Sequence, residues 1–230
     1  SCKDGYAHLQ TAAQTQKWPM TLDEQSSFGP GDAEALYAMI RTTRPARVIE
    51  VGCGFSSLVI MAALRDGRID AEYTLIEPHP HEWLADAVKN AGATLRAEII
   101  QHTPAALFDT LQEDDVLFLD SSHVVSVGSD TNLEILELLP RLNTGVIIHF
   151  HDIFLPEEYP RHWFTEKGLF WQEQYLLHAF LMFNSEFEVI LPMCALCAHD
   201  RERVCQAIPS LRKNPARRPG SFWIRRKNTR

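Results

Sequence analysis

The sequence lacks the features that would assign it to a membrane, secreted or disulfide-stabilised class. None of its apolar runs approaches the ~18 residues that a transmembrane helix needs. Residues 1–10 (SCKDGYAHLQ) do not show the basic segment followed by an apolar segment of a secretory signal. The five cysteines, an odd number, indicate reduced thiols and not a disulfide framework. We therefore expect a cytoplasmic protein that makes no contact with a membrane.

The negative charge of the chain is unevenly distributed. Residues 201–230 hold ten Lys or Arg and one acid, a net charge of +9, which leaves −17 for residues 1–200. Such a basic segment could contact nucleic acid or an anionic substrate, or it could be a solvated tail that balances an acidic body. We favour the solvated tail and expect no nucleic-acid partner.

Short apolar segments alternate with helical patterns over most of the 230 residues. Strands are predicted at residues 47–51, 73–76, 94–100, 116–119, 145–150, 187–191 and 221–226. Helices are predicted at residues 32–41, with Asp32 as the N-cap, and at 56–65, 81–91, 131–139 and 171–183, with a short one from residue 104. This alternation predicts an α/β fold with a doubly wound, mainly parallel seven-stranded sheet and helices on both faces. We divide the chain into a lead-in segment (1–30) and one domain (31–230), with an insertion at about 192–220 and a basic C-terminal tail.

The first predicted strand runs into a loop with two glycines, RVIEVGCGFSS at residues 47–57. Glycine permits a tight turn and a close approach of the backbone to a ligand, and the next helix begins with free N–H groups. A loop that binds NAD would have a third glycine where this chain has Ser57, and Glu50 would set a carboxylate beside the diphosphate. The loop therefore favours a cationic or amine-bearing ligand, and an NAD-dependent oxidoreductase is disfavoured.

Polar and titratable residues follow the next strands at the positions where those strands end. They are Glu77 and Pro78 after the second strand, His102 after the third, Asp120, Ser122 and His123 after the fourth, and His149, His151 and Asp152 at the fifth. The carboxyl ends of parallel strands meet at one edge of a sheet, where ligands bind. Glu77 lies 23 residues beyond Gly54, close to the spacing of an acid that binds ribose hydroxyls. The convergence of these groups predicts a functional site at this edge.

The series VIEVGCGFSS, LIEP, FLDSSH, VIIHFHDIFLPEEYP and WQEQYLL resembles the class I S-adenosylmethionine (SAM) dependent methyltransferases. Within that superfamily it is similar to the methyltransferase-24 type of small bacterial enzymes. The resemblance implies a Rossmann-like fold with a C-terminal antiparallel hairpin, SAM as cofactor, and O-methylation of a small molecule of sugar or natural-product type. The cofactor-binding residues that it implies are Glu50, Gly52, Cys53, Gly54, Glu77, Pro78, His102, Asp120 and Ser122.

Two routes of acceptor activation are open. His123 or His151 could act as a general base, with Asp152 orienting the histidine or taking the proton itself. Alternatively, a divalent cation held by Asp120 and Asp152 could lower the pKa of the acceptor hydroxyl. Metal-dependent relatives pair an Asp with Asp or Asn after the fifth strand, where this chain has His151 and Asp152. We therefore assign catalysis to His123, His151 and Asp152 and do not favour a metal.

Other functions would need sequence features that this chain lacks. Enzymes that methylate the amines of nucleobases resemble one another in an (N/D)PPY loop, and this chain has DSSH there. A metal hydrolase built on His149 and His151 would need a continued HxHxDH pattern, which is absent. The single CxxC at residues 194–197 favours ordinary thiols over a zinc site. A SAM-binding protein with little catalysis stays an alternative, and the sequence leaves the oligomeric state open.

Overall fold

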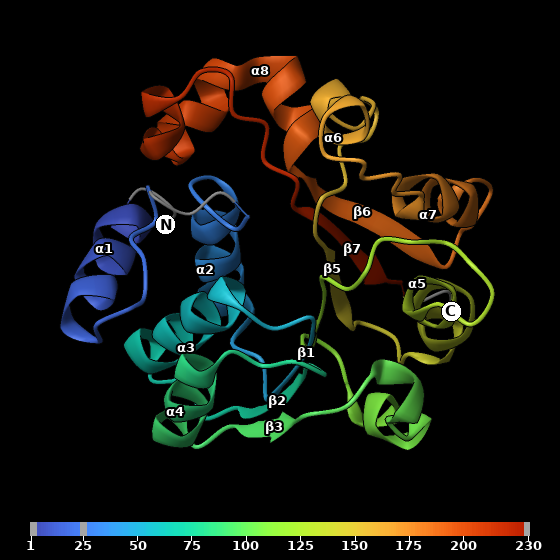
Figure 1. Ribbon diagram of the computed structural model, residues 1–230, viewed down its shortest axis with the longest axis horizontal. Helices are drawn as coiled ribbons and strands as arrows, with labels where there is room; N and C mark the ends of the chain where they lie inside the picture. Colours follow the sequence, from blue (N-terminus) through green and yellow to red (C-terminus); the bar gives the residue numbers. More distant parts are fainter. Residues whose placement is uncertain (1–3, 24–26, 228–230) are drawn as a thin grey trace.

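Seven strands form one sheet in the computed structural model, which describes residues 4–23 and 27–227 (Figure 1). The strands are β1 (Arg47–Val51), β2 (Glu72–Ile76), β3 (Thr94–Arg96), β4 (Val116–Leu119), β5 (Ile147–Phe150), β6 (Phe187–Pro192) and β7 (Phe222–Arg226). Their spatial order is β3-β2-β1-β4-β5-β7-β6. Neighbours from β3 to β5 are parallel, whereas β7 is antiparallel to both β5 and β6. The expected mainly parallel sheet with its C-terminal antiparallel hairpin is confirmed.

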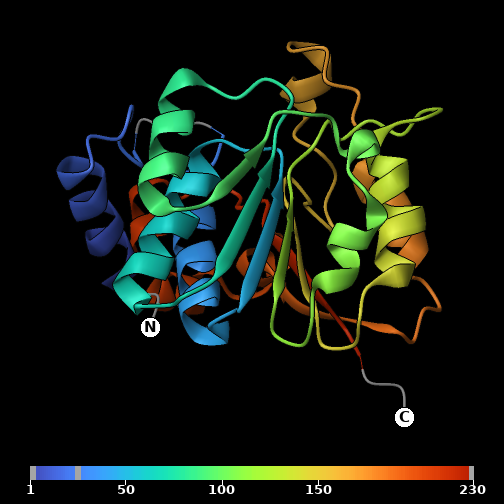
Figure 2. The same cartoon turned by 90° about the horizontal axis from the view of Figure 1, so that it is seen from below.

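Helices cover both faces of the sheet (Figure 2). One face carries α1 (Gly5–Thr15), α2 (Asp32–Thr43), α3 (Phe55–Gly67) and α4 (Glu82–Ala91). The other face carries the short helices η2 (Ile100–His102) and η3 (Ala105–Thr110), α5 (Asp130–Asn132), η4 (Leu133–Leu138), η5 (Leu139–Arg141) and α7 (Glu173–Leu181). The connection from β5 to β6 also contains α6 (Arg161–Thr165), and the connection from β6 to β7 contains α8 (Met193–Ala207) and η6 (Pro209–Lys213).

The central strands are mostly apolar on both faces because each face is covered by helices. Successive side chains of β1 show this, since Val48 packs in the core under α2 and α3, and Ile49 packs in the core under η3 and η4. Both side chains are at most 2% exposed. The parallel strands therefore hold a fixed register, and their carboxyl ends meet at one edge of the sheet.

The structure differs from the expected elements in three places. Residues 1–30 include the helix α1, whose Leu9 and Ala12 are buried against the core. The third strand ends at Arg96 and not at residue 100, because its one partner strand, β2, ends at Ile76 opposite Arg96. Asp32, expected as the N-cap of its helix, lies inside it, and its carboxylate accepts a hydrogen bond from the Ser221 N–H (2.9 Å).

The connection between β6 and β7 contains α8 and η6. Met193 and Cys197 of α8 pack against Ala35 of α2, so this connection lies against the N-terminal helices (Figure 1). The non-helical angles of Asp200 break α8 into two parts. Across the described ranges, no helix combines the length and the apolar character needed to span a membrane.

Candidate active site

The loop between β1 and α3 makes a turn that requires glycine at position 52. Gly52 has φ +78°, and its N–H donates to the carbonyl of Ile76 (3.1 Å). A Cβ on Gly52 would lie 2.5 Å from the carbonyl carbon of Asp120 and closer still to its oxygen. The loops that follow β1, β2 and β4 are therefore in direct contact, and no side chain separates them.

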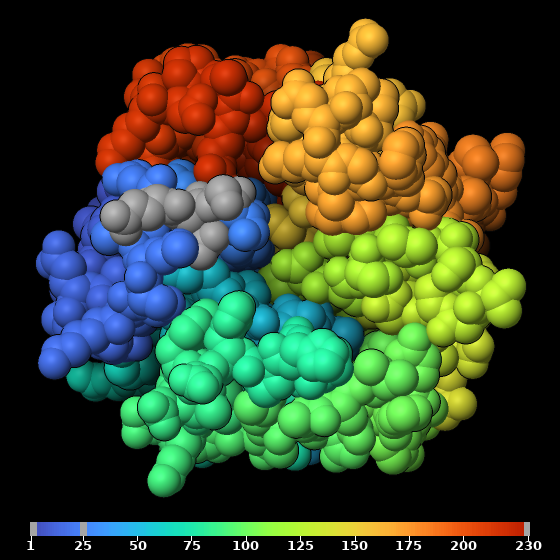
Figure 3. All heavy atoms as spheres, in the orientation of Figure 1, coloured from blue at the N-terminus to red at the C-terminus, as the bar shows by residue number. Residues whose placement is uncertain are grey.

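Two hollows adjoin this loop. The first, of about 480 Å³, is lined by the glycine loop together with Phe28 and Trp83, and the second, of about 290 Å³, lies toward Gln101 and Asp130. Gly52, Glu77 and Asp120 line both of them. In Figure 3 the face is hollowed near its centre, where the cyan, yellow-green and orange parts of the chain meet. The two hollows form an elongated groove across the ends of β1, β2 and β4.

Most of the cofactor residues expected from the sequence line this groove. They are Gly52, Cys53, Gly54, Glu77, Pro78, Asp120 and Ser122. His102 does not line it, and its neighbour Gln101 does. Glu77 holds the loop by accepting hydrogen bonds from the N–H groups of Cys53 (3.2 Å) and His79 (2.8 Å).

Glu50 lies beneath the groove and not in its wall. It is fully buried, and it accepts hydrogen bonds from the hydroxyl of Ser56 (2.6 Å) and from that of Tyr73. Burial raises the pKa of Glu50 to about 7. Its contacts join the start of α3 to β2, so the carboxylate supports the glycine loop from below. A direct contact of Glu50 with a ligand stays a prediction.

His123 is held between two carboxylates. Its Nε2 lies 3.3 Å from Asp120 Oδ1, its Nδ1 lies 2.6 Å from Glu173 Oε2, and Trp171 packs on its ring at 4.2 Å. Burial opposes charge on this ring, but Glu173 and Asp120 outweigh burial and raise the pKa of His123 well above its ordinary value. His123 is therefore an imidazolium that donates on both sides and orients Asp120.

His151 is a second buried imidazolium. Its Nε2 donates to the carbonyl of Ser27 (3.1 Å) and lies 3.6 Å from Asp152 Oδ1. Burial would lower the pKa of His151, but the nearby carboxylates, Asp152 foremost, raise it to about 9. Asp152 has the opposite balance, because burial raises its pKa to about 6 although His151 lowers it. Near neutral pH the pair is a carboxylate beside an imidazolium.

A third hollow, of about 830 Å³, opens at the end of β5. Asp152 lines it, together with Phe154 and Trp163 from the loop and helix that follow β5. Ser27 lines both this hollow and the 480 Å³ hollow, so the two adjoin. His123 and His151 do not line it. Among the three residues assigned to catalysis, Asp152 is thus the one that faces this space.

Gly220, just before β7, fixes the backbone of Asp152. A Cβ at Gly220 would lie 2.8 Å from the Cα of Asp152 and 3.0 Å from its N. The Ile153 N–H donates to the carbonyl of Gly220 (2.9 Å), which ties the two segments together. Gly220 was not singled out from the sequence, since no local pattern marks a glycine that approaches a residue so far away in the chain.

His149 and the thiols are core residues. The ring of His149 stacks on Phe118 (4.1 Å) and packs at a tilt against Trp223 (4.6 Å), and burial lowers its pKa well below the ordinary value. Cys194 and Cys197 are buried free thiols. Over residues 4–23 and 27–227, no three His, Cys, Asp or Glu side chains gather as a metal site would require.

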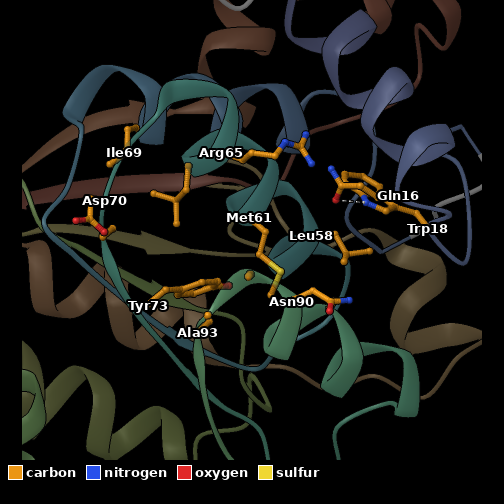
Figure 4. A pocket seen from close by; sticks show the side chains of 15 residues that line it. Gln16, Trp18, Leu58, Met61, Arg65, Ile69, Asp70, Tyr73, Asn90 and Ala93 are labelled. Atoms are coloured by element: carbon orange, nitrogen blue, oxygen red, sulfur yellow. Dashed lines mark hydrogen bonds between the residues drawn. The ribbon is translucent and has the colours of Figure 1, made fainter.

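Figure 4 shows another hollow, of about 540 Å³, on the α3 and α4 side of the molecule. Leu58, Met61 and Tyr73 supply apolar walls, and Arg65 and Asp70 lie at its rim. It includes none of the residues that follow the strand ends. The candidate site is therefore the groove and the adjoining hollow at the carboxyl edge of the sheet.

Comparison with known proteins identifies a family that matches part of this chain. Residues 49–153 match a family described as a methyltransferase domain, of the methyltransferase-24 type. An uncharacterised protein of Archaeoglobus fulgidus is 36% identical over 85 residues. That stretch is 36% of this chain and 38% of the archaeal protein, so the likeness concerns less than half of either one.

Solved structures share the fold. The S-adenosylhomocysteine (SAH) bound methyltransferase PaMTH1 of Podospora anserina has a TM-score of 0.52 at 18% identity, over 96% of this chain and 88% of that one. A protein of Klebsiella pneumoniae, named as a candidate O-methyltransferase, has a TM-score of 0.54 at 12% identity, over 97% and 90%. At these identities the likeness shows the architecture of the chain.

Proposed function

We propose that the chain, whose residues 49–153 match a methyltransferase domain, is a class I SAM-dependent methyltransferase that methylates a hydroxyl of a small molecule. One observation carries the proposal: the groove at Gly52 and the hollow at Asp152 adjoin at Ser27. A cofactor in the groove and an acceptor in the hollow would therefore face each other.

The groove fits SAM by its shape and by its polar groups. The glycine loop leaves open space at Gly54, since no protein atom lies within 4 Å of a Cβ built there. Glu77 stands at the position from which an acid binds ribose hydroxyls. Trp83 and Asp120 also line the groove, so they could contact the parts of the cofactor that Glu77 does not reach. SAM, when bound, supplies an activated methyl group, so the protein mainly aligns the acceptor.

Asp152 is the general base in this proposal. With a pKa of about 6 it is ionised at neutral pH, and it lines the acceptor hollow. His151 is a positioning residue, since its imidazolium lies against Asp152 and is itself anchored to the carbonyl of Ser27. His123 is likewise a positioning residue, since its imidazolium lies against Asp120. Neither histidine has a free basic nitrogen at neutral pH, so Asp152 is the better candidate to take the hydroxyl proton.

A cation held by Asp120 and Asp152 is the less favoured alternative. Each of these carboxylates already faces a protonated histidine, His123 at 3.3 Å and His151 at 3.6 Å. A divalent cation placed between the carboxylates would compete with both imidazolium groups for the same oxygens. The charge balance of the site thus supports base catalysis by the chain itself.

The proposed activity is tested by incubating the protein with methyl-labelled SAM and a panel of small hydroxylated compounds. We expect SAH to form only when an acceptor is present, together with a methyl ether identified by mass spectrometry. A label found on nitrogen or carbon of the acceptor would contradict O-methylation. SAH formed at the same rate without any acceptor would contradict the proposed transfer.

A further inference from the structure

The acceptor hollow is lined by more arginine than the proposed reaction uses. Arg161 comes from α6, and Arg217 and Arg218 come from the segment between η6 and β7. Proton abstraction by Asp152 needs none of these guanidinium groups. The position of these three arginines in the lining of the hollow therefore needs another explanation.

Arg218 already has protein partners. Its Nη1 donates to Glu157 Oε2 at 2.8 Å, and its guanidinium lies 5.3 Å from the centre of the Phe154 ring. These contacts attach the segment before β7 to the loop after β5. Arg218 is therefore a structural cation in the wall of the hollow.

Arg217 has no such partner. Its Nε is buried and makes no hydrogen bond, and its side chain forms no ion pair within 4.0 Å in the described part of the chain. A guanidinium has five donors, and a buried donor without an acceptor costs free energy. Asp32, which also lines the hollow, is stabilised as a carboxylate by the charge of Arg217, but the hydrogen bond that it accepts comes from the Ser221 N–H (2.9 Å). Arg217 is thus a cation with unused donors in the wall of the hollow.

Arg161 is a second guanidinium that lines the hollow. It begins α6, its side chain is exposed, and it forms no ion pair with any residue that the structure describes. Two guanidinium groups from separate segments thus border the space next to Asp152. An anion in the hollow could accept hydrogen bonds from the two Nη groups of Arg217, in the bidentate geometry typical of carboxylate and phosphate.

We propose that the acceptor carries an anionic group, a carboxylate or a phosphate, which binds Arg217 with help from Arg161 while its hydroxyl faces Asp152. This assignment rests on the proposed function, because it treats the hollow as the acceptor site. It gives the basic segment before β7 a role in substrate selection, and it narrows the substrate class to hydroxylated acids or phosphate esters.

The test is calorimetric titration of the protein with benzoate, phenyl phosphate and the uncharged benzyl alcohol, with and without saturating SAH. We expect at least one anion to bind ~10-fold or more tightly than benzyl alcohol, the effect of one or two charge-assisted hydrogen bonds. The tighter anion identifies carboxylate or phosphate as the group recognised. Arg217→Gln is expected to remove this preference, and Arg161→Gln to reduce it.

Arg212→Gln is the matched control, since it removes one guanidinium that is paired with Glu202 outside the hollow. It should keep the preference for the anion. Equal binding of all three probes by the wild-type protein would overturn the assignment, and so would equal losses in Arg217→Gln and Arg212→Gln. Unchanged SAH affinity shows that a variant is folded. Absence of SAH binding in the wild-type protein would instead refute the proposed function, while the anion titration without SAH would still report on Arg217.

Discussion

Replacing Gly52 with alanine is expected to lower the affinity for SAH by ~100-fold or more, a loss of about 3 kcal/mol. The added Cβ would lie 2.5 Å from the carbonyl carbon of Asp120, and φ at this position is +78°, which L side chains rarely adopt. The loops after β1 and β4 would have to separate, and both parts of the cofactor groove would change shape. Calorimetric titration with SAH measures the effect.

Gly54→Ala is the control for folding. Its Cβ would meet no protein atom within 4 Å, and its φ of −169° lies outside the left-handed range that favours glycine. We expect this variant to keep the melting temperature of the wild-type protein, whereas Gly52→Ala melts earlier. If Gly52→Ala bound SAH within about threefold of wild type, the groove would not be the cofactor site.

Replacing Asp152 with asparagine is expected to lower kcat by ~10²- to 10⁴-fold, the usual range for a general base. Affinity for SAH should stay within about threefold, because the cofactor groove does not include Asp152. The pKa of Asp152 is about 6, so wild-type activity should be lost as the pH falls through that value and the carboxylate becomes protonated. Asp152→Asn should lack this acid limb. Turnover measured from pH 5 to 8 tests both statements.

Two further variants make this prediction sharper. Gly220→Ala leaves the carboxyl group in place but displaces its backbone, since the new Cβ would lie 2.8 Å from the Cα of Asp152. A misplacement of this kind costs up to ~10²-fold in rate, and we expect kcat to fall while SAH affinity is kept. Asp86→Asn, an exposed change on α4, should leave both quantities unchanged. Full activity in Asp152→Asn would show that the acceptor is activated elsewhere.

The cofactor side of the site could be predicted from the sequence because it is local. Gly52, Cys53 and Gly54 follow β1 directly, Glu77 follows β2, and Asp120 follows β4, so the order of the strands brings them together. The parallel α/β pattern alone predicts that these ends share one edge. Glu50 shows the limit of that reasoning, since its hydrogen-bond partners Ser56 and Tyr73 turn it toward the core.

The acceptor side depends on contacts between distant segments. Ser27 binds His151 from 124 residues away, and Glu173 binds His123 from 50 residues away. Arg217 reaches the hollow from a segment that by charge alone reads as a solvated tail. These pairings follow from how the loops fold over the sheet edge, and no period or motif in the sequence specifies them. The protonation states of His123 and His151 depend on the same contacts.

Titration of the wild-type protein with SAH and with NAD⁺ tests most directly whether SAM binds at the carboxyl edge of the sheet. We expect SAH to bind at one site per chain and NAD⁺ to give no heat, because Ser57 replaces the third glycine of a dinucleotide loop. Binding of NAD⁺ without any SAH signal would contradict the account.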